Sequence, residues 1–258
     1  MSLDIQHAAA QRMRRLIGGL VVLVVILVAG VVVLVTRGGG SPSSAPTAAP
    51  APSAPSPSST ATPRPVATET DDGSTFLAPS TWVALPAGKA TKQGLPTGFP
   101  HTVEGAAAVA VASVRAGWTW DADAAARAAA VYAVPADAAA LQKAARASTA
   151  NSRVSVGLPG TGALPADAQM TSSPIGVQWK NVTADRATLS VEARVVYTAG
   201  SGQPQKTQVI ATTAECDWIA GDWHIKAGPG EDSPEPFDLG TAGFNSAGWR
   251  ALQEGDNQ

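Results

Sequence analysis

Residues 186–197 read RATLSVEARVVY, and this stretch decides the fold. Apolar and polar side chains alternate along it, which is the pattern of a long β-strand that buries one face. The apolar positions are Ala187, Leu189, Val191, Ala193, Val195 and Tyr197. A strand of this length needs neighbours to be stable, so we expect a sheet to be built around it.

Shorter alternating runs flank this strand on both sides. Their apolar positions are Ile175, Val177 and Trp179 before it, and Ile210, Ala214, Cys216, Trp218, Trp223, Ile225 and Ala227 after it. Turn-forming residues separate the runs at 181–185, 199–202 and 220–222. The pattern predicts an antiparallel meander, to which residues 153–158 could add a shorter strand.

A helix is predicted upstream of these strands. Thr102 is a suitable N-cap, and Glu104 follows in the first turn, where the helix dipole favours an acid. Apolar residues then recur every three or four positions as far as Trp118, which gives one apolar stripe. The first helix should therefore run to about Gly117.

Two further helices complete the helical part. Asp121 or Asp123 caps an Ala-rich helix that ends near Val134. Pro135, in a first-turn position, opens a third helix, which fades at residues 148–151. Before the helices, residues 76–100 mix apolar side chains with glycines and prolines, which predicts an ordered irregular arm over the domain.

Near the N-terminus, residues 16–35 read LIGGLVVLVVILVAGVVVLV and contain no charged side chain. At about 1.5 Å per residue a helix of this length spans the hydrocarbon core of a bilayer. Arg12, Arg14 and Arg15 precede the run and only Arg37 follows it, so the positive-inside rule places the C-terminal part outside the cytoplasm. The run is too long for a secretory signal and lacks a small-residue cleavage site, so we expect an uncleaved single-pass anchor in the cell membrane.

The anchor divides the chain into five segments. Residues 1–15 form a cytoplasmic tail, residues 16–36 the transmembrane helix, and residues 37–74 a disordered linker rich in Pro, Ser, Thr and Ala. Residues 75–230 form an extracytoplasmic α+β domain. The acidic tail 231–258 carries scattered large apolar residues, so we expect part of it to dock on the domain.

The order of helices and strands resembles the cone-like fold of nuclear transport factor two and its relatives, in which a curved antiparallel sheet wraps three helices. The hairpin DWIAGDWHI at 217–225 carries this resemblance, which covers residues 80–228. Together with one anchor and a short cytoplasmic tail, the chain resembles the bitopic subunit of type IV secretion and conjugation systems. Residues 98–106, GFPHTVEGA, resemble a motif of uncharacterised actinobacterial mobile-element proteins. The resemblance implies a subunit of a conjugative transfer assembly.

Charge and cysteine content exclude several classes of function. The chain has a net charge of −2, and residues 75–258 contain no basic run, whereas nucleic-acid binding needs clustered positive charge, so no nucleic-acid partner is expected. The single cysteine, Cys216, cannot form an intrachain disulfide. No cofactor motif is recognisable, and neither exported histidine has a companion at a metal-ligand spacing, so no cofactor or metal is predicted.

Few residues suggest a functional site. His101 and Glu104, three residues apart near a helix start, could share one face and act as an acid-base pair in a pocket. The alternative is that Glu104 only interacts with the helix dipole and both side chains face water. Among the tryptophans, Trp118, Trp179, Trp218 and Trp223 occupy positions where the periodicity predicts burial. Trp82, Trp120 and Trp249 have looser settings and could anchor an interface.

The sequence thus predicts a non-enzymatic, membrane-anchored scaffold subunit of a conjugative transfer or type IV secretion-like assembly. Its expected partners are the lipid bilayer and other membrane proteins of that assembly, with oligomers left open. One alternative is a stalked cell-envelope module that binds a small apolar ligand or wall component. A second is an enzyme of the same fold, which needs a histidine or aspartate inside a pocket.

Overall fold

The computed structural model describes residues 68–69, 75–228 and 231–253. The predicted cytoplasmic tail and the apolar run 16–35 lie outside these residues. In the part that the structure describes, no helix has the length and apolar character needed to cross a bilayer. Two residues of the predicted linker, Thr68–Glu69, form β1, which pairs antiparallel with β2 (Thr75–Phe76).

A six-stranded sheet forms the body of the molecule, with the order β3-β10-β6-β7-β8-β9. Its centre is the antiparallel meander β6 (Ala168–Lys180), β7 (Arg186–Ala199) and β8 (Lys206–Ile219). A two-residue turn then leads into β9 (Asp222–Ile225). Both turn residues, Ala220 and Gly221, have positive φ, as a tight hairpin of matching twist requires. The predicted meander is confirmed in these four strands.

The sheet is mixed rather than purely antiparallel, which corrects the prediction. The chain end supplies β10 (Arg250–Leu252), which pairs antiparallel with the outer edge of β6. The arm supplies β3 (Trp82–Val83), which runs parallel to β10. The Val83 carbonyl accepts the backbone N–H of Gln253 at 2.9 Å. These strands have only two or three residues each, too few for a periodic signal.

The helices are α2 (Val103–Gly117), α3 (Ala122–Tyr132) and α4 (Ala138–Ser155), with a 3₁₀ turn, η1 (Pro135–Asp137), before α4. The Thr102 and Asp121 side chains cap α2 and α3 as predicted, by accepting backbone N–H bonds. α4 continues past residue 151, so the strand predicted at 153–158 is wrong. The reason is Arg153, which turns inward and anchors the end of α4 through its guanidinium.

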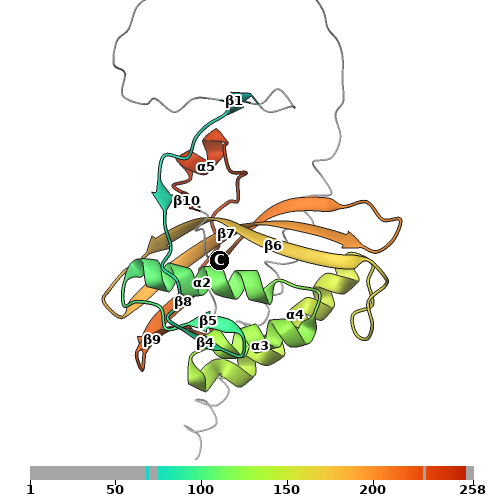
Figure 1. The fold of residues 1–258 in the computed structure, drawn as a ribbon, viewed down its shortest axis with the longest axis horizontal. Helices are drawn as coiled ribbons and strands as arrows, with labels where there is room; N and C mark the ends of the chain where they lie inside the picture. Colours follow the sequence, from blue (N-terminus) through green and yellow to red (C-terminus); the bar gives the residue numbers. More distant parts are fainter. Residues whose placement is uncertain (1–67, 70–74, 229–230, 254–258) are drawn as a thin grey trace, which may run out of the picture.

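Helices and tail occupy opposite faces of the sheet (Figure 1). α2 lies directly against β6 and β7, α3 packs on α2, and α4 packs on α3. Alanines on α2 allow a close approach, and the core is completed by Val109, Val177, Leu189 and Trp223. On the other face, the tail residues Phe244, Trp249 and Ala251 form a second cluster, which includes the short α5 (Ala242–Ser246).

The C-terminal tail changes the environment of β7. The alternating sequence predicts one buried face, but β7 is buried on both faces from Ala187 to Ala193. The second face is covered by the tail, whose Phe237 and Leu239 also contact the second cluster. Residues 231–253 are therefore packed on the domain. The carboxyl group of Glu192 is enclosed as a result.

Candidate functional site: a charged hollow beside the β8–β9 hairpin

The segment GFPHTVEGA at 98–106 joins the arm to α2 and is fixed by the β8–β9 hairpin. The arm forms the small hairpin β4 (Ala90–Lys92) and β5 (Leu95–Thr97) just before it. The Asp222 carboxylate then accepts the backbone N–H groups of Gly98, at 2.7 Å, and Phe99, at 3.0 Å. The Trp223 indole N–H donates to the Pro100 carbonyl at 3.0 Å.

Gly105 explains why this segment can turn directly into a helix. A Cβ atom at Gly105 would lie 1.9 Å from the Pro100 carbonyl oxygen, far inside van der Waals contact. Only glycine therefore allows the first turn of α2 to pass this carbonyl. The motif has a structural role, which is to hold residues 98–101 against the hairpin.

These contacts place His101 on the surface of the hairpin. Its imidazole stacks on the Trp218 indole, with the ring centroids 4.0 Å apart and an interplanar angle of 10°. Its Nε2 lies 2.9 Å from Asp185 Oδ1, in the turn between β6 and β7. Three segments distant in sequence thus meet at one place, and both members of the His101–Asp185 pair remain exposed.

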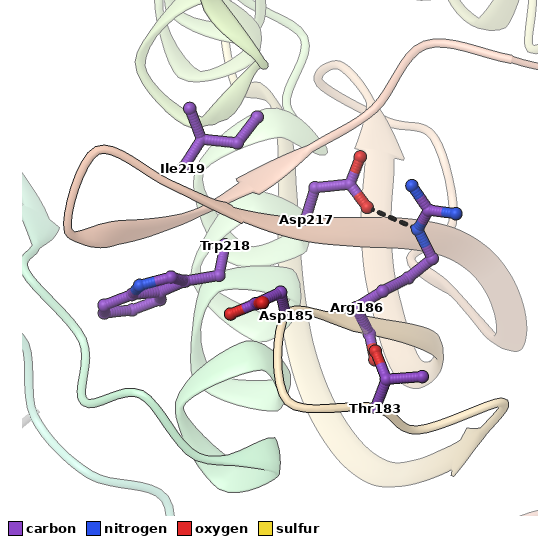
Figure 2. A pocket seen from close by; sticks show the side chains of 6 residues that line it. All are labelled: Thr183, Asp185, Arg186, Asp217, Trp218 and Ile219. Atoms are coloured by element: carbon purple, nitrogen blue, oxygen red, sulfur yellow. Dashed lines mark hydrogen bonds and ion pairs between the residues drawn. The ribbon is translucent and has the colours of Figure 1, made fainter.

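Beside this stack lies a hollow of about 360 Å³ that opens widely to solvent (Figure 2). It is lined by Thr183, Asp185, Arg186, Asp217, Trp218 and Ile219. Figure 2 shows Asp217 turned toward Arg186, and the carboxylate accepts the Arg186 Nε–H bond at 2.7 Å. We call this set of residues, with His101, the hairpin hollow.

A chain of ion pairs extends from the hairpin hollow along β8 to Lys226, which follows β9. Arg186 Nε lies 3.0 Å from Glu215 Oε1, which in turn lies 3.5 Å from Lys226 Nζ. The hydrogen bond to Asp217, with the negative charges of Asp217 and Glu215, raises the pKa of Arg186 above its usual value. Charges of both signs therefore alternate on this surface.

The chemistry that the hairpin hollow can perform is limited, because its polar side chains already bind one another or the backbone. Asp185 is engaged by His101 and Asp217 by Arg186. The Thr183 hydroxyl donates to the Arg186 carbonyl at 3.3 Å. Within the described residues, no group of three or more metal-ligating side chains comes together.

The sequence predicted some of these residues and not others. His101 belongs to the hairpin hollow, where it pairs with Asp185 and not with Glu104. Glu104 lies in the first turn of α2, where its negative charge interacts favourably with the helix dipole. Asp185, Arg186 and Trp218 were not proposed as site residues. The sequence signal that could have pointed to this site is the β8–β9 hairpin pattern, because it places Asp217 and Trp218 next to a turn.

The three tryptophans proposed as interface anchors lie in different environments. Trp82 is 47% exposed, at the opposite edge of the sheet. The prediction is corrected for Trp120, 5% exposed, and Trp249, 1% exposed, which cannot meet a partner. Trp120 packs edge-on against Tyr197, and Trp249 packs beside Phe244 under the tail. Of the four predicted core tryptophans, Trp223 is buried, and Trp118, Trp179 and Trp218 are partly buried against the core.

A second unusual group is Glu192, which is fully buried beneath the tail. Its Oε1 accepts the backbone N–H of Phe237, while Oε2 has no hydrogen-bond partner among the described residues. Burial raises the pKa of Glu192 to about 8, and the negative charge of Asp238 contributes in the same direction. At neutral pH the protonated form is therefore favoured.

Comparison with known proteins adds no further constraint. No family model matches the chain, and no curated protein and no solved structure shows significant similarity to it.

Proposed function

We propose that the chain is a non-enzymatic, single-pass membrane protein whose extracytoplasmic domain acts as a scaffold subunit of a conjugative transfer or type IV secretion-like assembly. The anchor rests on the uncharged run 16–35 and on the arginines that precede it. The linker 37–74 acts as a stalk that lifts the domain off the membrane. The domain itself supplies the binding surface.

The hairpin hollow is the surface that meets a neighbouring subunit. The single observation that carries this proposal is the stack of His101 on Trp218, which is open to solvent and rimmed by paired charges of both signs. Aromatic side chains provide contact area at low entropic cost, and surrounding charge pairs give orientation and specificity rather than raw affinity. Such a surface favours recognition of another protein.

The alternative of a module binding a small apolar ligand is less well supported by the hairpin hollow. Trp218 and Ile219 are its only apolar lining residues, and the other four are polar or charged. Small-molecule sites are mostly apolar and enclose most of the ligand surface, whereas this hollow opens widely to solvent.

An enzyme of the same fold also finds less support. His101 and Asp185 form a hydrogen-bonded pair, but the hydroxyl lining the hollow, Thr183, is directed at a backbone carbonyl. General acid-base catalysis works best in a site that excludes water, and this pair is exposed. Partner binding is therefore the function that the surface suits best.

The test uses the tagged full chain, co-expressed with the genes next to its own. We expect the protein to remain in the membrane fraction, with the domain accessible to protease from outside the cell. We expect detergent-solubilised chain to co-purify with a transfer ATPase or membrane subunit encoded in that neighbourhood. Asp185→Lys should lower this recovery by about tenfold, because it removes the partner of His101 and reverses a charge on the proposed contact surface, where charge complementarity with the neighbouring subunit is needed.

The matched control is Asp123→Lys, because Asp123 forms a similar exposed ion pair with Arg146 on the helical side. It should leave recovery unchanged. Equal loss in both variants, or no co-purifying subunit with the parent chain, would reject the scaffold proposal. Recovery of the chain in the medium without residues 1–36 would reject the anchor.

A further inference from the structure

The outer edge of β8 is unpaired over most of its length. β7 pairs with β8 continuously from Lys206 to Asp217. On the other side, β9 pairs only with Cys216–Ile219, and the Lys226 N–H reaches back to the Glu215 carbonyl at 2.9 Å. Within the described residues, no strand pairs with the outer edge at residues 206–214. This segment is called the free edge below.

The hairpin shows which backbone groups the free edge presents. A two-residue turn makes Ile219 and Asp222 a hydrogen-bonded pair, and such pairs alternate along an antiparallel ladder. Odd-numbered residues of β8 therefore direct N–H and C=O toward the β9 side, as the bond at Glu215 illustrates. The backbone N–H and C=O groups of even-numbered residues point toward β7 instead, as the hydrogen bond from the Trp218 N–H to the Asp185 carbonyl shows.

This alternation continues to the start of the strand, because the pairing with β7 contains no bulge. The residues with outward-facing backbone groups are Thr207, Val209, Ala211 and Thr213. Proteins usually protect such an edge with proline, charge, a bulge or a very short strand. The free edge reads KTQVIATTA and has none of these except the terminal Lys206. The opposite edge of the sheet, by contrast, is the two-residue β3.

We propose that the free edge is an interface between two copies of this chain, whose β8 strands pair antiparallel about a two-fold axis at Ile210. This interface is separate from the hairpin hollow, and it rests on backbone pairing and not on the proposed function. In this register residue 207 pairs with the partner's 213, and residue 209 with the partner's 211. Outward-facing backbone N–H and C=O groups of one copy therefore meet only outward-facing groups of the other. A shift by two residues in one direction sets residue 207 opposite Glu215, which is already bonded to Lys226. A shift in the other direction sets residue 213 opposite Gln205, which precedes the strand.

The side chains of the free edge are compatible with this register. Ile210 meets the partner's Ile210 on the helix face of the sheet, where the side chain is now only partly buried. Thr207 and Thr213 are both β-branched and meet on the other face. Lys206 meets the partner's Ala214, so no like charges oppose each other. About eight backbone hydrogen bonds would join the two sheets into one.

Disulfide trapping tests the register in the full chain, in membranes of the expressing cells. Ile210 opposes its own copy in a non-hydrogen-bonded pair, where Cα atoms lie about 4.5 Å apart, within disulfide range. Ile210→Cys should form a covalent dimer under mild oxidation. The matched control is Thr212→Cys, on the same face, whose copies would lie about 13 Å apart. We expect about tenfold more dimer from Ile210→Cys, because the control exceeds disulfide reach. The parent chain controls for Cys216, which is buried.

A second change tests the backbone pairing itself. Val209→Pro removes an outward N–H but leaves the ladder to β7 intact, so the domain should keep its thermal transition. In the Ile210→Cys chain, Val209→Pro should abolish the covalent dimer. Val209→Thr in the same chain should leave the dimer in place. Equal trapping at positions 210 and 212, no trapping at 210 in a folded chain, or a disulfide from 210 to another protein would each overturn the proposal.

Discussion

The carboxylate of Asp222 binds the backbone N–H of Gly98, 124 residues earlier in the chain, at 2.7 Å. Its second oxygen accepts the N–H groups of Phe99 and Trp223. The first residue of β9 thus holds the arm in place, and the arm places His101 on Trp218. The position of His101 in the hairpin hollow therefore depends on this side chain, whereas the other lining residues belong to the sheet and its turns.

Asp222→Asn should weaken the attachment of the arm. Asparagine offers one acceptor oxygen and turns its NH₂ group toward backbone donors, so at least one N–H loses its partner. We expect a loss of about 1–3 kcal/mol in the free energy of unfolding, the cost of an unpaired, partly buried donor. Hydrogen exchange at Gly98 and Phe99 should accelerate. Asp232→Asn, the same change at an exposed acid, should alter neither quantity. Matching losses in both variants would contradict the role assigned to Asp222.

Gly105 passes so close to the Pro100 carbonyl that a side chain at this position should destabilise the fold. Gly105→Ala places a methyl group 1.9 Å from the Pro100 oxygen and must displace the first turn of α2. We expect a loss of at least about 3 kcal/mol in thermal or urea unfolding, which is in the range of severe overpacking. Gly117→Ala is the control, since nothing lies within 4 Å of a Cβ atom at the other end of the same helix. That variant should be neutral or more stable by about 0.5 kcal/mol.

The elements that the sequence predicted well are those in which a local pattern repeats. β7 alternates over its whole length, and α2 carries both an apolar stripe and a capping threonine. The Ala220–Gly221 turn likewise contains its own signal in the positive φ values that it needs. Local periodicity and turn chemistry were therefore sufficient for the meander and the three helices.

The elements that the sequence missed depend on contacts between distant segments. β10 and β3 have two or three residues, and they exist because the tail and the arm meet at the edge of β6. Trp249 is buried only because the tail returns to the sheet. The hairpin hollow combines His101 with Asp185 and Trp218, and no local pattern connects these residues.

Glu192 should make stability depend on pH. Its folded-state pKa of about 8 exceeds the usual value of 4.5, so the folded chain holds a proton that the unfolded chain releases. Its favourable contribution is complete below about pH 4.5 and is lost as the pH rises through 8. The slope is at most about 1.4 kcal/mol per pH unit, the value for one proton. Glu192→Gln should flatten this dependence and make the chain relatively more stable at pH 8.

The charged neighbours of Glu192 determine the controls for this experiment. Asp238 lies on the tail and pairs with Arg194 of β7, so Asp238→Asn should lower the midpoint of the pH dependence without abolishing it. Glu235→Gln changes an exposed acid of the same tail and should leave the curve as in the parent chain. Urea unfolding between pH 5 and 9 measures the effect, with hydrogen exchange at Phe237 reporting on the tail. A curve unchanged by Glu192→Gln would contradict the assignment.

Arg153 provides the last prediction, because it is a cation that is only 7% exposed and that binds carbonyl groups. Its Nε and Nη2 donate to the Trp120 carbonyl, and its Nη1 donates to the Gly162 carbonyl, which ties α4 to the α2–α3 turn. Arg153→Met should cost about 1–3 kcal/mol in the free energy of unfolding, since the buried Trp120 oxygen loses its donors. Arg153→Lys should recover only part of this, because an ammonium group lacks the planar fork that serves both carbonyls.

Arg146 lies two turns earlier on α4 and forms an exposed ion pair with Asp123, which makes it the matched control. Arg146→Met should change the free energy of unfolding by no more than about 0.5 kcal/mol, as exposed pairs contribute little. The change in the urea midpoint, with the denaturant slope of the unfolding free energy unchanged, measures the effect of both variants. If Arg146→Met proved as costly as Arg153→Met, the stability of α4 would depend on helix charge in general rather than on the carbonyl contacts of Arg153.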